Sequence, residues 1–175
     1  ETQRWRGYLV RAADDEFLAA TDAKLKLIAD GYGDTDKEVW QALTRDSRLA
    51  VVDSLVVPSN SGDFSDDDVP FEMEGFSYED ETMLPVDLEI REPRTGEVIR
   101  VTVIGVMDRL TDAFGEIGLG MFLSRRQLEA DLPFRIPTTT YRFKVSEGVD
   151  TVLTARSIEA AFRENGMETE VMAEL

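Results

Sequence analysis

Residues 84–107, LPVDLEIREPRTGEVIRVTVIGVM, decide the fold of this chain. In the first arm charged residues alternate with the apolar Val86, Leu88 and Ile90, which is typical of a strand with one buried face. The turn at residues 93–96, Pro-Arg-Thr-Gly, separates this arm from a second run of β-forming residues, so the stretch predicts a β-hairpin. The second arm is almost entirely apolar as far as Gly105, which indicates a strand at the centre of its sheet.

The closing part of the chain predicts a strand, a tight turn, a helix and another strand over residues 141–171, with the first strand beginning after Pro137 at residues 138–145. Asp150 is suited to cap the helix, and Gly166 stands where a residue with positive φ ends one. Four apolar residues between them recur at helical spacing: Val152, Ala155, Ile158 and Phe162.

Three further strands are predicted from apolar and β-branched runs. They cover residues 4–12, residues 49–58 and residues 119–124. The second of these runs, LAVVDSLVVP, is broken by Asp53 and Ser54 before its proline ends it.

Two helices are predicted from caps and apolar spacing. Asp36 is suited to cap a helix over residues 37–45, and Ser124 to cap one over residues 125–132. Residues 14–33 are ambiguous. Four apolar residues there are consistent with one helix face that two glycines would end: Phe17, Leu18, Leu25 and Ile28.

Mixed helices and strands with an antiparallel hairpin predict an α+β fold with mixed or antiparallel sheets. The 175 residues suit a single domain, residues 1–175. Within it we expect two lobes. The first combines residues 1–58 with residues 138–175, and the second, richer in β-structure, covers residues 59–137.

Composition excludes several classes of function. The chain has 19 Lys and Arg against 36 Asp and Glu, a net charge of −17, so we expect no binding to nucleic acid. It has no cysteine and no histidine, which removes thiolate nucleophiles, disulfides and the commonest general base. No run approaches the ~18 apolar residues that a membrane helix needs. The chain opens with Glu1 and no methionine, so we interpret it as an excised part of a longer protein.

Two groups of acidic residues raise the question of a calcium site. One lies in or beside a loop rich in Ser, Asn, Gly and Pro: Asp63, Asp66, Asp67, Asp68 and Glu72. The other comprises Asp30, Asp34, Asp36 and Glu38. Neither has the glycine that the EF-hand pattern requires at its sixth position. We therefore predict no metal site and interpret both groups as solvated charge, while cation binding by residues 59–69 stays open.

No enzyme motif is complete. Asp53-Ser54 lacks a glycine elbow and a histidine partner, and the glycine-rich residues 115–120 lack the phosphate-loop spacing and its lysine. With 36 acidic residues, carboxylate pairs at the separation of a glycosidase arise by chance, and no feature selects one. We predict no catalytic residue and no cofactor. A hydrolase that uses two carboxylates is retained as an alternative.

The sequence indicates one place for Trp40 and leaves two places open for Trp5. Trp40 lies on the apolar side of its predicted helix and is expected in the core. Trp5 stands near the start of the chain, where a place in the core and a place at a membrane interface both remain open.

Four segments together resemble the extracytoplasmic domain of FtsX-like and MacB-like ABC transporter permeases. Residues 36–58 are similar to the family's helix followed by an apolar strand, and residues 94–108, RTGEVIRVTVIGVMD, to its hairpin arm. Residues 118–132, GLGMFLSRRQLEADL, resemble its strand and capped helix, and residues 141–171 its closing strand–helix–strand. The acidic residues 59–80 match no part of the family pattern.

The resemblance implies a porter-like lobe rich in βαβ units plus a second β-rich lobe, inserted between membrane helices outside the bacterial cell membrane. It implies a dimeric permease, a separate cytoplasmic ATP-binding subunit and an extracytoplasmic partner or substrate. The implied function is to couple ATP hydrolysis to export, lipoprotein release or cell-envelope signalling, without catalytic residues in this domain. The alternative is a secreted or cell-surface binding module outside any transporter.

Overall fold

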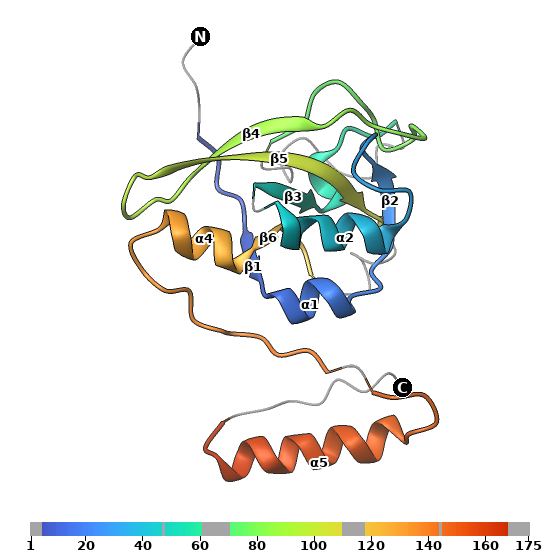
Figure 1. The fold of residues 1–175 in the computed structure, drawn as a ribbon, viewed down its shortest axis with the longest axis vertical. Coiled ribbons are helices and arrows are strands. Elements are labelled where there is room, and N and C mark those ends of the chain that lie inside the picture. The colour runs from blue at the N-terminus through green and yellow to red at the C-terminus, as the bar shows by residue number, and fades with distance from the viewer. Residues whose placement is uncertain (1–4, 47, 61–70, 110–117, 144, 168–175) are drawn as a thin grey trace. The chain divides into compact units, whose positions relative to one another are not determined.

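The computed structural model describes residues 5–46, 48–60, 71–109, 118–143 and 145–167. Contacts within the chain divide it into two compact units, Glu1–Pro137 and Thr138–Leu175. The first unit holds the strands and most of the helices. Among its described residues, the second holds one helix (Figure 1).

The first unit is built on a sheet of six strands. The strands are β1 (Val10–Ala13), β2 (Leu25–Ile28), β3 (Leu49–Val52), β4 (Val86–Arg91), β5 (Val98–Met107) and β6 (Met121–Ser124). The helices among the described residues of this unit are α1 (Asp15–Ala20), α2 (Asp36–Arg45) and α4 (Arg125–Asp131), with a short 3-10 helix at Ser54–Val56. The second unit contains α5 (Thr151–Glu164).

The sheet is mixed. Its strands follow the order β1-β6-β3-β5-β2, and β4 also pairs with β5. The pairs β1–β6 and β3–β5 are parallel, whereas β3–β6, β2–β5 and β4–β5 are antiparallel. Helices and a mixed sheet together confirm the predicted α+β fold.

The hairpin predicted from residues 84–107 is confirmed. β4 and β5 pair in antiparallel register from Val86 opposite Val103 to Arg91 opposite Val98. The apolar residues of β4 are half-buried and its charged residues exposed, as their alternation predicts. The last five residues of β5 are all buried, and this part of the strand pairs with β3 on one edge and with the start of β4 and with β2 on the other.

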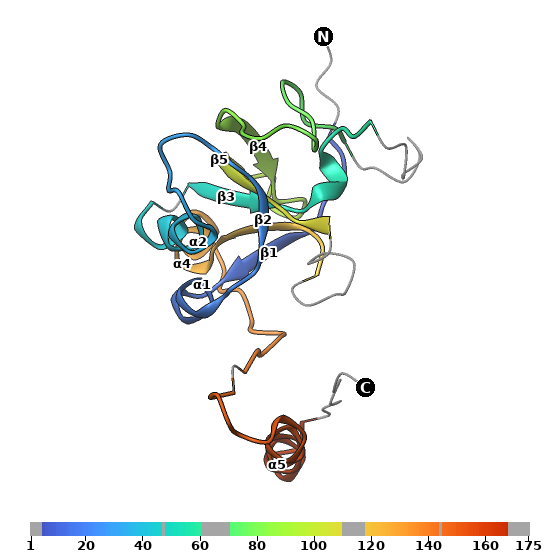
Figure 2. The same cartoon turned by 90° about the vertical axis from the view of Figure 1, so that its right-hand side faces the viewer.

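Helices α1, α2 and α4 lie together against one face of the sheet (Figure 2). Three aromatic rings fill the space beneath them: Trp40 lies 5.6 Å from Phe122 and 6.3 Å from Phe17, measured between ring centres. Helix α2 also approaches β5 closely, since a Cβ atom at Gly105 would lie 3.2 Å from Cγ1 of Val39. Trp40 is completely buried, which confirms its predicted place in the core.

One predicted helix start is wrong by one residue, and the ambiguous stretch is settled by the structure. The N-cap of α2 is Thr35 and not Asp36, because Thr35 and Glu38 form a reciprocal capping box. Ser124 does stand at the N-cap position of α4, but its side chain makes no capping hydrogen bond. Residues 14–33 form the helix α1 and the strand β2 rather than one helix.

The sheet does not follow the expected lobe boundary at residue 58. β1 and β3, which precede that boundary, pair with β6 and β5, which follow it. Residues 5–58 and the later strands therefore share one sheet and one core. The reason is that an apolar strand such as β3 is buried on both faces and needs a paired strand on each edge.

The second unit departs from the predicted strand–helix–strand. Helix α5 has the predicted ends, because the Asp150 side chain accepts a hydrogen bond from the Leu153 amide and Gly166 has a φ of 75°. However, the described part of residues 138–145 forms no strand, since no described strand of this unit is available for it to pair with. The rings of Tyr141 and Phe143 instead approach Phe162 of α5. The strand predicted after Gly166 falls largely outside the described residues.

Candidate functional site

The most completely buried acidic group that the structure describes is Asp53, at the end of β3. One carboxylate oxygen accepts a hydrogen bond from the Leu55 amide at 2.9 Å and thereby caps the short 3-10 helix. The other oxygen accepts one from the Gly120 amide at 2.6 Å. The Asp53 amide in turn donates to the Gly120 carbonyl at 3.1 Å. Asp53, which breaks the apolar run of residues 49–58, thus joins the end of β3 to Gly120 at the start of β6.

Gly120 has a steric reason to be glycine. Its φ is 127°, and a Cβ atom there would lie 2.7 Å from the carbonyl oxygen of Leu9. The close approach lets the Met121 amide donate to that same oxygen at 2.9 Å, where β1 begins to pair with β6. Gly118, in the same glycine-rich stretch, also has a positive φ, of 84°. Residues 115–117 of the same stretch lie outside the described residues.

The Asp53 carboxylate lies at Gly120 where a phosphate loop would hold its anion. In a phosphate loop the backbone amides point at the ligand. Here the Gly120 amide points at Asp53. The two sequence features that suggested enzyme chemistry, Asp53-Ser54 and the glycine-rich stretch, therefore come together as a structural contact.

Burial raises the pKa of Asp53 above its ordinary value, against the opposing effect of the hydrogen bonds from the Gly120 amide, the Tyr8 side chain and the Leu55 amide. A raised carboxyl pKa in a protein is often a sign of acid–base catalysis. A catalytic acid must also reach a substrate proton. Asp53 has no exposed surface and both oxygens bind backbone amides, so its geometry supports a role in holding the fold.

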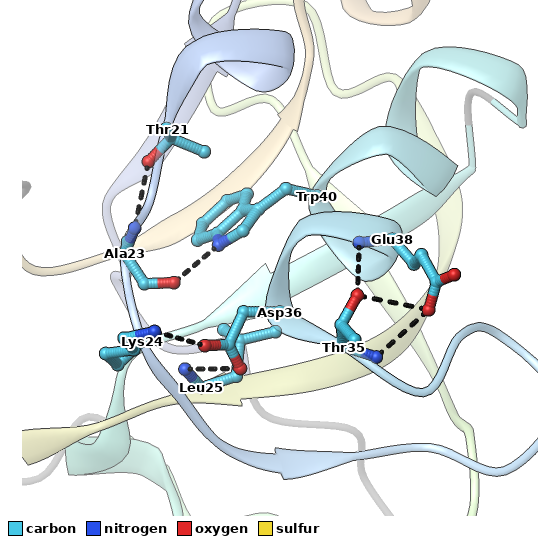
Figure 3. A network of polar contacts seen from close by, with 8 residues as sticks. All are labelled: Thr21, Ala23, Lys24, Leu25, Thr35, Asp36, Glu38 and Trp40. Carbon is cyan, nitrogen blue, oxygen red and sulfur yellow. Dashed lines mark hydrogen bonds and ion pairs between the residues drawn. The ribbon is translucent and has the colours of Figure 1, made fainter.

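In the second acidic group, Glu38 and Asp36 make separate contacts at the start of α2 (Figure 3). Glu38 accepts hydrogen bonds from the amides of Asp34 and Thr35, which lower its pKa together with a bond from the Thr35 hydroxyl. Asp36 turns the other way, accepting a hydrogen bond from the Leu25 amide at 3.3 Å and forming an ion pair with Lys24 at 3.3 Å (Figure 3).

The two contacts of Asp36 fasten the start of α2 to Lys24 and to Leu25, where β2 begins. The Trp40 indole adds a third, donating to the Ala23 carbonyl at 3.0 Å (Figure 3). Asp30 and Asp34 are exposed, and among the described residues no three acidic side chains gather in a way that would hold a metal ion. Glu72 is exposed as well, while Asp63, Asp66, Asp67 and Asp68 lie outside the described residues.

One cluster was not predicted. The Arg109 guanidinium lies 4.2 Å from the centre of the Tyr78 ring, and the Tyr78 hydroxyl accepts a hydrogen bond from the Arg109 amide at 3.0 Å. The Lys26 ammonium lies 5.7 Å from the same ring. These residues are far apart in the sequence and match no motif, so only their packing reveals the cluster. Near the chain start, Trp5 is partly exposed and stacks with Arg91 at 4.6 Å.

Comparisons with protein-family models, with curated proteins and with solved structures found no match. Among the residues that the structure describes, no helix is both long and apolar enough to cross a membrane.

Proposed function

We propose that this chain is a non-catalytic extracytoplasmic domain of an ABC transporter permease of the FtsX-like and MacB-like type. In this role it couples ATP hydrolysis by a cytoplasmic subunit to export, lipoprotein release or signalling at the cell envelope. The domain contributes a stiff body and a surface, and the chemistry takes place in the other subunit.

One observation carries the proposal: four segments resemble that family and occur in the family's order. Three of them coincide with elements of the fold. They are α2 followed by β3, the β5 arm of the hairpin, and β6 followed by α4. The sequence also has no Gly-x-x-x-x-Gly-Lys-Ser/Thr motif, in keeping with an ATP-binding site on a separate subunit.

The mechanics of the sheet also support the proposal. A domain passes on the movement of membrane helices only if it resists deformation. β5 pairs with three other strands, and the interior beneath the helices is filled by large side chains. Close-packed interiors transmit strain because they compress little.

Labelling of single cysteines tests the location. These 175 residues contain no cysteine, so Lys37→Cys adds a thiol on the exposed side of α2, and labelling is compared with that of the same reading frame without the substitution. In intact cells that express the complete reading frame, a membrane-impermeant maleimide is expected to label this variant. Val103→Cys is the matched control, since Val103 is buried and should react only after denaturation. Labelling of Lys37→Cys only after lysis would refute an extracytoplasmic place.

Fractionation distinguishes the two classes of function. A permease is expected to stay in the membrane fraction after an alkaline wash and to purify with an ATP-binding subunit. A secreted or cell-surface binding module would also be labelled from outside, but it would purify without that subunit.

A further inference from the structure

We propose that Asn165 is a site of spontaneous deamidation and that the C-terminal cap of helix α5 controls its rate. Asn165 is followed by Gly166, which has no side chain to hinder attack on the asparagine. In the reaction the Gly166 backbone nitrogen loses its proton and bonds to Cγ of Asn165, and the side-chain amide leaves as ammonia. Water then opens the cyclic imide to aspartate or isoaspartate.

The cap holds both reacting groups away from this path. The Gly166 amide donates to the Arg163 carbonyl at 3.0 Å, and the Asn165 side-chain amide donates to the Ala161 carbonyl at 2.8 Å. The Met167 amide closes the cap on the Phe162 carbonyl at 3.1 Å. The ψ of Asn165 is 13°, which keeps the Gly166 nitrogen turned away from Cγ. The folded cap is therefore unreactive, and reaction requires the last turn to open.

Opening of this last turn requires little free energy, because helix α5 has no buried residue. A helix of 14 residues is marginal in water unless packing stabilises it, and the packing of α5 is limited to half-buried residues such as Ile158 and Phe162. Segments with few buried contacts open most readily in native proteins. Asn165 is exposed, so water reaches the imide once it forms.

The product favours the open state. Aspartate at position 165 loses the donor that binds the Ala161 carbonyl, and it places a negative charge at the negative end of the helix macrodipole beside Glu164. Deamidation of Asn165 thus weakens the C-terminal cap of α5. The modification is slow and irreversible, and it changes both the charge and the order of this helix.

Peptide mapping of the full chain during incubation at mildly alkaline pH tests the proposal, with the mass gain and the isoaspartate content of the Asn165 peptide as readouts. Asn60, the other asparagine of the chain, serves as the internal reference. The exposed Ala160 is changed to glycine to loosen the helix without touching the reacting residues. This change is expected to raise the rate at Asn165 about fivefold, and to leave Asn60 unchanged.

A second measurement separates opening from chemistry. In denaturant the unmodified chain and Ala160→Gly should convert Asn165 at the same rate, faster than in the folded unmodified chain. Equal rates for the two folded proteins would overturn the control by α5. An Asn165 that stays intact even in denaturant would overturn the site itself.

Discussion

Replacing Asp53 by asparagine tests whether the buried carboxylate holds β3 to the start of β6. The substitution keeps the shape of the side chain and removes its charge. A carboxylate offers two acceptor oxygens, which here bind the amides of Leu55 and Gly120, whereas asparagine offers one acceptor oxygen and one NH₂ donor. One of the two backbone amides must then face a donor in a site without water contact.

The magnitude follows from the cost of that unpaired group. A buried donor left without its acceptor costs about 1–3 kcal/mol. Removal of a buried charge offsets part of this cost, because burial disfavours the ionised form of Asp53. We expect the unpaired amide to dominate at pH 7, with unfolding easier by about 1–2 kcal/mol and a fall in Tm of about 2–4 °C for each kcal/mol.

Urea unfolding monitored by circular dichroism measures the difference, with Asp87→Asn as the matched control. Asp87 is exposed and accepts a hydrogen bond from the Thr102 hydroxyl at 2.7 Å, so its replacement should change stability by less than about 0.5 kcal/mol. A variant at position 53 as stable as the unmodified chain at pH 7, or more stable, would refute the role assigned to the hydrogen bonds.

The pH dependence tests the effect of burial separately. The pKa of Asp53 is raised in the folded chain, so the folded state binds a proton more readily than the unfolded state. The stability from this group is therefore fully present below the unfolded pKa and is lost as the pH rises through the folded pKa. Asparagine does not titrate, so the gap between the two proteins should widen as the pH falls from neutral. A difference in stability that narrows as the pH falls would show that the pKa of Asp53 is lowered in the folded chain, and would refute the effect assigned to burial.

Four further outcomes are expected. Thr35→Ala should lower the free energy of unfolding by about 1 kcal/mol in a urea titration, because the capping box of α2 loses its hydroxyl acceptor. Gly105→Ala should cost about 1–3 kcal/mol through crowding against Val39, whereas Gly7→Ala, which meets nothing within 4 Å, should be near neutral in the same assay. A chain that ends at Pro137 should unfold cooperatively with an unchanged midpoint, since the buried apolar residues described lie between Ala13 and Leu128, and loss of cooperativity would contradict this. Replacing Asp66, Asp67 and Asp68 together by asparagine should leave Tm nearly unchanged, and a calcium-dependent rise in the unmodified chain would instead indicate a cation site.

Features that depend on neighbouring residues were predictable from the sequence. The hairpin β4–β5 follows from alternation and a turn within 24 residues, and the start of α5 at Asp150 follows from a side chain that reaches an amide three residues on. The predicted N-cap of α2 was wrong by one residue, Asp36 in place of Thr35, because the side chains of both residues are suited to cap a helix.

Features that depend on distant partners were decided by the tertiary structure. The apolar pattern of β3 shows that it is buried, but it does not specify β5 on one edge and β6 on the other. The aromatic and β-branched residues before α5 have strand propensity, yet a strand forms only where another strand offers its hydrogen-bonding groups. Asp53 shows the same limit: the sequence presents it as a break in a strand, and only folding brings Gly120, 67 positions away, to its carboxylate. Propensity and capping act over a few residues, whereas strand pairing and burial depend on which distant segments meet.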